Sequence, residues 1–226
     1  MSSVLITGAN RGIGLEFARQ YAASGWTVHA ACRQPHSAGE LNALGGIRLH
    51  EIDVTDHNSI DALAAKIDEP IDVVIANAGV MGPRSDQQSF GSFDYEAWRA
   101  VMEVNLYGTV HTCEAFTPHL EKGDQKKLAV LSSKMGSIAD TSGGLAHYRT
   151  SKTALNMAIM ASAAGLAQKG IAAGIFHPGW VQTDMGGPSA LITTEECVTG
   201  LRQQIAGLPV TAKPDFLTFD GEVLSW

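Results

Sequence analysis

Short apolar segments alternate along this chain with longer segments in which apolar residues recur every three or four positions. The apolar segments have the composition of buried parallel strands, and they lie at residues 4–6, 26–32, 47–52, 71–76, 128–131, 171–176 and 215–219. The longer segments have helical spacing and lie at residues 15–23, 57–68, 95–120, 146–168 and 194–207. Because strands and helices alternate without a linker or an internal repeat, the pattern predicts an α/β fold. We expect one domain over residues 1–226, with a doubly wound parallel sheet of about seven strands.

Two stretches interrupt this alternation. A predicted surface loop at residues 82–92 contains Gly82, Pro83, Ser85, Gly91 and Ser92. Asn105 lies in an otherwise apolar helical segment. Because a buried asparagine must find partners, we expect Asn105 to mark a local helix distortion that binds water.

The composition is that of an ordinary soluble globular protein, since 45% of the 226 residues are hydrophobic and 17% are charged. The net charge is −7 and no basic patch or tail is found, which argues against nucleic acid as a partner. No apolar run approaches the roughly 18 residues that a membrane span needs. The N-terminus also lacks the basic region of a signal peptide. We therefore expect neither nucleic acid nor a membrane as a partner.

Three cysteines, Cys32, Cys113 and Cys197, are scattered along the chain. An odd number of widely spaced thiols fits small buried side chains in a reducing cytoplasm better than a disulfide framework or a zinc site. The eight histidines do not have the spacing of a metal-binding motif. We therefore expect a cytoplasmic protein without a metal.

The first predicted strand leads directly into a glycine-rich turn, which is followed by a helix. The turn has the sequence Thr7-Gly8-Ala9-Asn10-Arg11-Gly12-Ile13-Gly14. Glycines in such a turn allow a tight bend and let backbone N–H groups approach a pyrophosphate at the helix N-terminus. The spacing G-x-x-x-G-x-G differs from the commoner dinucleotide-binding spacing, and glycine turns also join strands to helices for packing reasons. The position directly after the first strand favours nucleotide binding.

The end of the second predicted strand bears on which nucleotide would bind. An NAD site usually places an acidic residue about 20 residues beyond the glycine turn, where it binds the ribose hydroxyls. Here that neighbourhood offers Cys32, Arg33 and Gln34, without a carboxylate. Arg33, assisted by Arg11, could receive a 2′-phosphate instead, although it could equally be a solvated arginine at a strand end. The residues favour NADP(H), with NAD(H) still possible.

Tyr148 and Lys152 are four residues apart in a run rich in Ala, Leu and Met, which predicts a helix. At this spacing both side chains leave the same helix face. Free tyrosine has a pKa of about 10, and a neighbouring cation lowers it, so the pair suits proton transfer. A tyrosine and a lysine also share a turn on the surface of many helices, so the pair alone does not decide the function.

Taken in order, these segments resemble the short-chain dehydrogenase/reductase family over nearly the whole chain. The matching segments are the glycine turn, Asp53-Val54, Asn77-Ala78-Gly79, Asn105, Ser132-Ser133, Tyr148 with Lys152, and Pro178-Gly179-x-x-x-Thr183. Within the family, the run Ser-Lys-Met-Gly-Ser-Ile and the ending Phe-Asp-Gly-Glu-Val-Leu-Ser-Trp resemble one subgroup. That subgroup contains carbonyl-reductase-like enzymes and the C-factor proteins, which are linked with cell–cell signalling.

The resemblance implies a catalytic tetrad and a nucleotide site. The catalytic residues would be Asn105, Ser133, Tyr148 and Lys152. The cofactor-binding residues would be Gly8, Asn10, Arg11, Gly12, Ile13, Gly14, Arg33, Asp53, Val54, Asn77, Ala78, Gly79, Tyr148, Lys152, Pro178, Gly179, Val181 and Thr183.

The resemblance also implies a role for each catalytic group. Tyr148 would exchange a proton with the carbonyl or alcohol oxygen. Lys152 would lower the pKa of Tyr148 and hydrogen-bond the nicotinamide ribose. Ser133 would stabilise charge on the substrate oxygen, and Asn105 would hold a water that links Lys152 to solvent.

Two features depart from the family pattern. Ser133 lies slightly farther before Tyr148 than is common in the family, so Ser132, Ser137 and Ser142 are competing candidates. The segment after Thr183 is short, so the flexible substrate lid that many members carry is reduced here.

The function that the resemblance implies is the interconversion of a carbonyl and an alcohol by hydride transfer with NADP(H). We expect a small apolar ketone or aldehyde, or its alcohol, in a pocket walled by Met135, Leu145, Trp180 and Met185, though these residues could equally be core. One alternative is a nucleotide-sensing or C-factor-like signalling protein, and the intact tetrad argues against it. Another is an epimerase or dehydratase, which usually has a longer C-terminal substrate region.

We also expect a homodimer or a homotetramer. In the family the usual interface is a four-helix contact made by the helices that here carry Asn105 and Tyr148. Small residues at three- and four-residue spacing, namely Ala154, Ala158, Ala161 and Gly165, would permit a close approach of two helices. These small residues could equally face the sheet.

Overall fold

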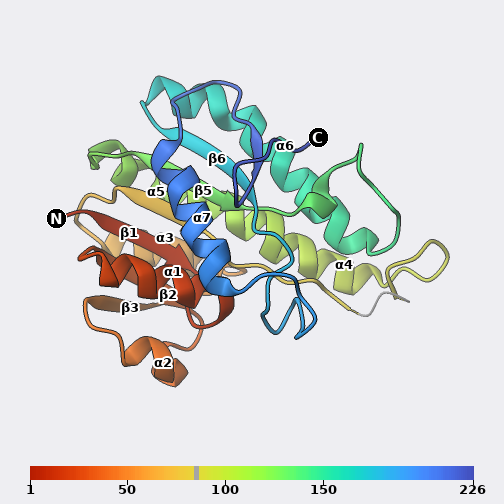
Figure 1. Cartoon of the computed structure of the whole chain (residues 1–226), viewed down its shortest axis with the longest axis horizontal. Coiled ribbons are helices and arrows are strands. Elements are labelled where there is room, and N and C mark those ends of the chain that lie inside the picture. Colours follow the sequence, from red (N-terminus) through yellow and green to blue (C-terminus); the bar gives the residue numbers. More distant parts are fainter. Residues whose placement is uncertain (84–86) are drawn as a thin grey trace.

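The computed structural model describes residues 1–83 and 87–226, so Ser85 of the predicted loop lies outside the described residues. The core of the fold is a sheet of seven parallel strands in the order β3-β2-β1-β4-β5-β6-β7 (Figure 1). The strands are β1 (Ser3–Thr7), β2 (Thr27–Cys32), β3 (Ile47–Glu51), β4 (Val73–Ala76), β5 (Lys127–Leu131), β6 (Ala172–His177) and β7 (Phe216–Thr218). The predicted doubly wound parallel sheet is confirmed.

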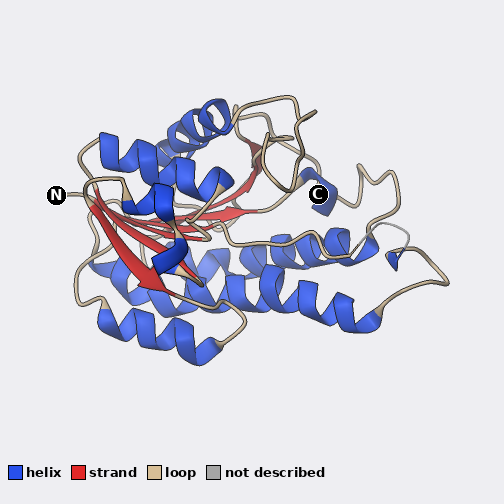
Figure 2. Ribbon diagram, turned by 90° about the horizontal axis from the view of Figure 1, so that it is seen from below, coloured by secondary structure: helices blue, strands red, loops and turns tan. Residues whose placement is uncertain are grey.

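Helices cover both faces of the sheet (Figure 2). The α-helices are α1 (Gly12–Ala23), α2 (Gly39–Asn42), α3 (His57–Lys66), α4 (Tyr95–Met102), α5 (Thr109–Lys122), α6 (Ala146–Gln168) and α7 (Thr194–Gly207). Helices α1, α2 and α7 contribute to one hydrophobic core, and α3, α5 and α6 contribute to the other. Shorter turns are η1 (Pro35–Ser37), η3 (Glu103–Gly108) and η4 (Lys134–Gly136).

Strand β1 shows why the apolar runs are almost continuous. Val4, Leu5 and Ile6 are all fully buried, but Val4 and Ile6 pack in the core with α1 and α7, whereas Leu5 packs in the core with α5 and α6. Successive side chains of a strand point to opposite faces, and here each face is covered by helices. A strand buried on both sides therefore needs an apolar residue at every position.

Some boundaries differ from the predicted ones because backbone groups near the strand ends are hydrogen-bonded outside the sheet. The fourth strand begins at Val73 instead of residue 71, since the Ile71 N–H donates to the His119 carbonyl at 3.2 Å. The carboxylate of Asp72 accepts the Ser3 N–H at 2.9 Å. The short elements η1 and α2 were not predicted, because three or four residues carry no periodic signal.

The predicted helix at residues 95–120 consists of α4, the π-helical turn η3 and α5. Asn105 lies inside η3, which confirms that it marks a helix distortion. The turn packs closely on the segment after β3, because a Cβ on Gly108 would lie 2.0 Å from the Val54 carbonyl oxygen. The π-turn thus positions Asn105 while the helix stays in contact with the sheet.

The order of the strands places the expected nucleotide site. Chain order runs outward from β1 to β3 on one side of the sheet and from β4 to β7 on the other. In open α/β sheets, ligands bind in the crevice beyond the carboxyl ends of the strands where the strand order reverses. Here that point lies between the ends of β1 and β4, which carry the glycine turn and Asn77.

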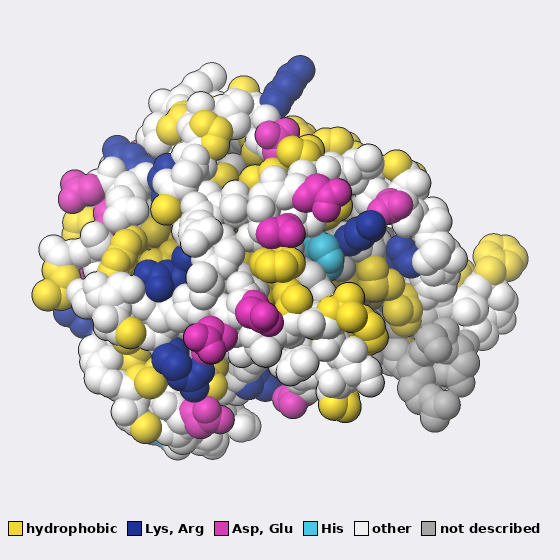
Figure 3. All heavy atoms as spheres, viewed as in Figure 1, with side chains coloured by type: hydrophobic (Ala, Val, Ile, Leu, Met, Phe, Trp, Pro, Cys, Tyr) yellow, Lys and Arg dark blue, Asp and Glu magenta, His cyan; other side chains and the backbone are white. Residues whose placement is uncertain are grey.

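In the part of the chain that the structure describes, no helix has the length and apolar character needed to cross a membrane. The longest helix, α6, contains 23 residues and includes Arg149 and Lys152 among its polar positions. Acidic and basic side chains are interspersed over the face of the molecule drawn in Figure 3.

Two histidines, the buried His29 and the partly buried His177, make the stability of the fold depend on pH. Burial lowers the pKa of His29 and of His177 to about 4, and the His29 ring also contacts His50, with 3.0 Å between Nδ1 and Nε2. A histidine in the unfolded chain has a pKa of roughly 6.5. Between that pH and about 4, the unfolded state therefore binds more protons than the folded state. We therefore expect the free energy of unfolding to fall on acidification, by about 2 kcal/mol at about pH 5 from His29 alone.

Urea unfolding at about pH 7 and about pH 5 checks this expectation. The His29→Gln variant should lose part of the pH dependence, because the titrating ring is gone. His36, which is exposed, provides the matched control as His36→Gln. An unchanged pH dependence in His29→Gln would contradict the prediction.

Candidate active site

The turn between β1 and α1 has the shape of a phosphate cradle. Gly8 and Gly12 have positive φ angles of 65° and 54°, which residues with a side chain rarely adopt. A Cβ on Gly14 would lie 2.2 Å from the Gly8 carbonyl oxygen, so the position accepts only glycine without movement of the turn. No side chain caps the start of α1, so its first N–H groups are available to an anion. The turn therefore fits the pyrophosphate of a dinucleotide.

Asn77, directly after β4, is joined to this turn by hydrogen bonds. Its Nδ2 donates to the carbonyl oxygens of Thr7 at 2.9 Å and of Gly8 at 3.3 Å. The Thr7 hydroxyl accepts the backbone N–H groups of Asn77 at 3.1 Å and of Ala78 at 3.2 Å. The Asn77 side chain thus holds the glycine turn in place.

The ends of β2 and β3 form the side of the crevice where the adenosine ribose is expected. Arg33 directly follows β2 and is exposed. Asp53, after β3, accepts the N–H of Thr55 at 2.9 Å and its hydroxyl at 2.7 Å. These bonds, together with the nearby positive charge of Arg33, lower the pKa of the Asp53 carboxyl. The structure thus brings Arg33 and Asp53 together, next to the buried Val54.

Arg11 is placed differently from the prediction. Its guanidinium donates to the Asp184 carboxylate at 2.8 Å instead of converging with Arg33 on one site. The two side chains are 66% and 77% exposed, and such pairs contribute about 0–1 kcal/mol. The loop that carries Asp184 also packs on the glycine turn, because a Cβ on Gly12 would lie 3.1 Å from Cγ2 of Thr183. One guanidinium nitrogen of Arg11 is thus engaged by Asp184 in this structure.

The loop after β6 contains the remaining expected cofactor residues, Pro178, Gly179, Val181 and Thr183. Gly179 has a φ of 88°, and Val181 is buried with 4% exposure. The Thr183 hydroxyl accepts the Gly186 N–H at 3.1 Å, which closes a tight turn. This loop therefore lies against the glycine turn, next to the start of α1.

Tyr148 and Lys152 lie in the first two turns of α6 and are buried, with 7% and 4% exposure. The Lys152 Nζ lies 5.9 Å from the centre of the Tyr148 ring and donates to the Leu131 carbonyl at 2.9 Å. Ser133, just beyond β5, accepts the Met135 N–H with its hydroxyl and lies near enough to the Tyr148 phenol to lower its pKa. The structure brings these three catalytic candidates together at the carboxyl end of the sheet.

The pKa of Tyr148 is opposite in direction to the expected one. Burial raises the pKa of the phenol, and the hydrogen bond to Ser133 opposes this effect only in part. Burial also lowers the pKa of the Lys152 ammonium to about 8. The predicted lowering of the Tyr148 pKa is therefore not found in this arrangement, because removal of the phenol from water outweighs the effect of Ser133. Tyr148 is held as a neutral phenol.

Asn105 is fully buried, and its amide is used by the backbone. Its Oδ1 accepts the Val80 N–H at 2.8 Å, while Nδ2 donates to the Val80 carbonyl at 2.8 Å and to the Ser151 hydroxyl at 3.0 Å. Both amide hydrogens are therefore engaged, and this side chain could join a water relay only as an acceptor. A Cβ on Gly79 would lie 3.3 Å from Oδ1 of Asn105 and 3.6 Å from Nζ of Lys152, so all three are neighbours.

The competing serines contact other groups. Their partners are the Asn156 side chain for Ser132, the Asp140 N–H for Ser137 and the Arg149 guanidinium for Ser142. Ser133 is the serine whose hydroxyl reaches the Tyr148 phenol. The geometry therefore favours Ser133 for the catalytic position.

The four residues expected to wall the substrate pocket fall into two pairs. Met135 and Leu145 are partly buried, whereas Trp180 and Met185 are 50% and 45% exposed. Trp180 is fixed by a hydrogen bond of 2.8 Å from its indole N–H to the Gly186 carbonyl. The alternative that these residues are core thus fails for Trp180 and Met185.

Among residues 1–83 and 87–226, no group of three or more His, Cys, Asp or Glu side chains could hold a metal ion.

Two residues at this site had no recognisable signal in the sequence. Asp184 binds Arg11, and Gln88 is fully buried although it lies in the predicted surface loop at residues 82–92. That prediction is wrong for Gln88, because its side-chain amide is enclosed by backbone groups that it hydrogen-bonds. Single polar residues in loops have no periodicity, so a sequence pattern cannot reveal their partners.

Comparison with known proteins supports the same architecture. The sequence model of the family described as short chain dehydrogenase matches residues 2–191. The chain is 36% identical over 234 aligned positions to 1-hydroxy-2-glutathionyl-2-methyl-3-butene dehydrogenase of Rhodococcus sp. (strain AD45), with 100% of each chain covered. It is 37% identical over 158 positions to the C-signal protein of Myxococcus xanthus, covering 70% of this chain and 93% of that protein. It is also similar to the NADPH-bound carbonyl reductase from chicken fatty liver, with 32% identity, a TM-score of 0.91 and coverage of 100% and 99%.

A parallel sheet with a glycine turn at its switch point, next to clustered Ser133, Tyr148 and Lys152 side chains, defines a nucleotide-binding oxidoreductase. The match over residues 2–191 and the full-length relatives take the assignment further. The chain belongs to the short-chain dehydrogenase/reductase family of NAD(P)-dependent enzymes. The resemblance seen in the sequence motifs is thereby confirmed.

Proposed function

We propose that this chain is an NADP(H)-dependent reductase that interconverts a small apolar ketone or aldehyde and its alcohol. The observation that carries the proposal is the buried cluster of Tyr148 and Lys152, with 5.9 Å between the Lys152 Nζ and the centre of the Tyr148 ring, next to Ser133, whose hydroxyl lowers the pKa of the phenol. The similarity to an NADPH-bound carbonyl reductase supports it. We place the protein in the cytoplasm, where its three buried, free cysteines would stay reduced.

The side chains divide the chemistry between them. A bound nicotinamide would supply the hydride. Ser133 and Tyr148 would hold the substrate oxygen by hydrogen bonds, and Tyr148 would give it a proton. Because burial keeps the phenol protonated at neutral pH, Tyr148 suits the role of acid in the reducing direction. Once the proton has left, the ammonium of Lys152 would stabilise the phenolate.

The direct test follows NADPH oxidation with a panel of ketones, aldehydes and quinones. We expect turnover with apolar carbonyl compounds, and the reverse reaction with the matching alcohols and NADP⁺. NADPH binding without turnover of any member of the panel would contradict the proposal. It would favour the second candidate, a nucleotide-sensing signalling protein, which the similarity to the Myxococcus xanthus C-signal protein supports.

We further propose that the 2′-phosphate of NADP(H) contacts Arg33. A carboxylate at the end of β2 would repel this phosphate, and the residues there are Cys32 and Arg33. The double replacement Cys32→Asp with Arg33→Ala should lower the ratio of kcat/KM for NADPH to that for NADH at least tenfold. A hydrogen bond to a charged group contributes about 1.5–3 kcal/mol, which is equivalent to roughly 10- to 150-fold.

The unmodified protein provides the reference for this cofactor prediction. Its kcat/KM should be higher with NADPH than with NADH, and NADH activity should not fall in the double variant. Arg11→Ala should have a smaller effect than Arg33→Ala, because Arg11 is paired with Asp184. Equal kcat/KM values for the two cofactors would show that Arg33 does not select the phosphate.

We propose that copies of this chain assemble into a homo-oligomer by contact between their outer faces of α4, η3 and α6. The small residues of α6 lie on this accessible side: Ala154 and Ala158 are partly exposed, and Ala161 and Gly165 are exposed. The sheet is contacted instead by other residues of the helix, including Leu155. The alternative that the small residues face the sheet is therefore excluded.

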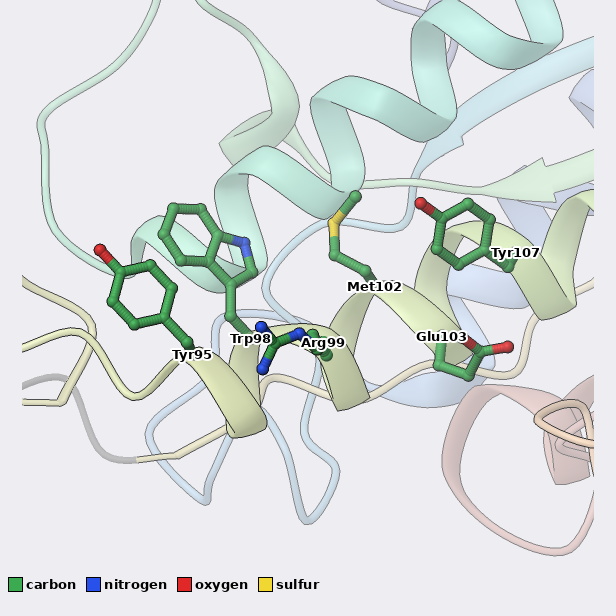
Figure 4. Close-up of a pocket in the computed structure, with 6 residues that line it drawn as sticks. All are labelled: Tyr95, Trp98, Arg99, Met102, Glu103 and Tyr107. Carbon is green, nitrogen blue, oxygen red and sulfur yellow. The ribbon is translucent and has the colours of Figure 1, made fainter.

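The adjoining part of this face is an open groove of about 440 Å³ along α4 and η3 (Figure 4). It is lined by Tyr95, Trp98, Arg99, Met102, Glu103 and Tyr107. The Trp98 indole N–H donates to the Thr150 hydroxyl at 2.9 Å, which fixes α4 against α6. We take the groove and the small residues of α6 together as the platform for a second copy.

Sedimentation equilibrium at micromolar concentration tests the assembly. We expect a dimer or a tetramer, and Ala158→Arg should shift it to the monomer by placing a long charged side chain on the platform. Glu195→Arg on α7, away from the platform, serves as the control. A single species at 23.9 kDa for the unmodified chain would refute the proposal.

A further inference from the structure

The helix that carries Tyr148 begins without a cap of its own. Its first residue is Ala146, and the preceding Leu145 has a left-handed conformation with a φ of 49°. No side chain of the cap residue bonds the first turn. Because the first N–H groups of a helix have no partner within it, they need acceptors from elsewhere in the fold.

Gln88 supplies two of these acceptors from a distant loop. Its backbone carbonyl accepts the Ala146 N–H at 3.2 Å, and its side-chain Oε1 accepts the Tyr148 N–H at 3.2 Å. The Nε2 of the same side chain donates to the Pro83 carbonyl at 2.7 Å and to the Met81 carbonyl at 3.4 Å. Gln88 is fully buried, so it does not exchange these partners for water.

The orientation of the Gln88 amide is set by its surroundings. On one side it faces the N–H of Tyr148, and on the other it faces two carbonyl oxygens. A flipped amide would place donor against donor and acceptor against acceptor, and unmade hydrogen bonds in a buried site are costly. The amide therefore links the loop after β4 to the first turn of α6 in one fixed geometry.

The same loop is also fixed at its beginning. Asn105 bonds both the N–H and the carbonyl of Val80, and Gln88 bonds the carbonyls of Met81 and Pro83. The start of α6 is therefore held relative to the π-turn through this loop. Within α6, it is the Tyr148 N–H that donates to the Gln88 side chain.

We propose that Gln88 is a positioning residue that sets the placement of Tyr148 in the active site. The proposal rests on the proposed function, because it takes Tyr148 as the acid of the reduction. A displacement of about 1 Å at a reacting group can lower the rate about 100-fold. Loss of the Gln88 side-chain amide should therefore reduce kcat more than it affects cofactor binding.

The test compares Gln88→Met with Gln87→Met. Methionine keeps the length and unbranched shape of glutamine and removes its hydrogen-bonding groups. Gln87 is the adjacent residue of the same loop, and its side chain is exposed. We expect Gln88→Met to lower kcat 10- to 100-fold, roughly, with the Kd for NADPH within about twofold of the unmodified protein. Gln87→Met should leave both quantities unchanged.

A second variant covers the case in which Gln88→Met does not fold. Gln88→Asn keeps an amide but is shorter by one methylene, so it cannot reach the Tyr148 N–H and the Pro83 carbonyl together. As for Gln88→Met, we expect a lower kcat with little change in the Kd for NADPH. A kcat within about twofold of the unmodified protein, in either variant that folds, would overturn the proposal.

Hydrogen exchange measures the cap without reference to catalysis. In Gln88→Met, the amide hydrogen of Tyr148 should exchange at least tenfold faster, because its acceptor is the side chain that is replaced. The amide hydrogens in the middle of α6 should keep their protection. Unchanged exchange at Tyr148 would overturn the proposal even if the enzyme is active. If the unmodified protein does not reduce any carbonyl compound, the proposed function fails, and the exchange result still decides whether Gln88 caps the helix.

Discussion

Replacing Tyr148 with phenylalanine is expected to lower kcat at least 100-fold and to leave the Kd for NADPH nearly unchanged. The ring is buried with 7% exposure, so phenylalanine keeps the packing and removes only the hydroxyl that Ser133 contacts. A general acid typically contributes about 10²- to 10⁴-fold to the rate. Among the described residues, no other phenol and no carboxyl group is found at the Ser133 hydroxyl. No second proton donor therefore replaces the lost one.

Steady-state kinetics with a carbonyl compound, together with an NADPH titration, measures both quantities. Tyr107→Phe is the matched control, because Tyr107 is 52% exposed and lies outside the catalytic cluster. It should retain full turnover. If Tyr148→Phe kept more than a tenth of the unmodified turnover, Tyr148 would not be the acid.

The second large effect is expected from Gly14→Ala. The added Cβ would lie 2.2 Å from the Gly8 carbonyl oxygen and 2.7 Å from Nδ2 of Asn77. The first contact is with backbone, so it cannot be relieved by turning a side chain, and the glycine turn itself must move. Because this turn is the expected pyrophosphate cradle, the Kd for NADPH should rise at least 100-fold.

Gly165→Ala in α6 is the control for this prediction. A Cβ there would meet no heavy atom of the chain within 4 Å. Because Gly165 lies far along α6 from the glycine turn, Gly165→Ala should bind NADPH normally. A Gly14→Ala protein that binds NADPH within about threefold of normal would show that the turn is not the cradle.

Much of the fold was predictable because its information is periodic and local. The helix predicted at residues 194–207 matches α7 (Thr194–Gly207), and its start is marked by a capping box formed by Thr193 and Glu196. Asn105 was predicted to distort its helix, and it lies in η3. Both signals come from neighbouring residues, and tertiary contacts did not override them.

The arrangement of the site was less predictable, because it depends on contacts between distant loops. Arg11 was expected to meet Arg33, but its guanidinium pairs with Asp184, which lies 173 residues away in sequence. The pKa of Tyr148 follows from how deeply the phenol is buried, and residue spacing does not reveal burial depth. Gln88 contacts Tyr148 across 60 residues. The spacing of residues along the chain identified the catalytic candidates, but it did not reveal which groups surround them.

The π-turn at Glu103–Gly108 has a consequence for how this gene can change. The turn accommodates one residue more than a regular helix needs, so deleting a residue there would restore regular helical bonding. Because the wide turn absorbs the extra residue, α4 and α5 would keep their faces toward the core after that repair, and Phe116 and Leu120 would stay buried. A deletion within α5 itself would instead turn the residues beyond it by about 100°, since a helix has about 3.6 residues per turn. The π-turn is therefore the place in this long helix where the chain could lose a residue and keep its packing, at the cost of the local geometry that holds Asn105.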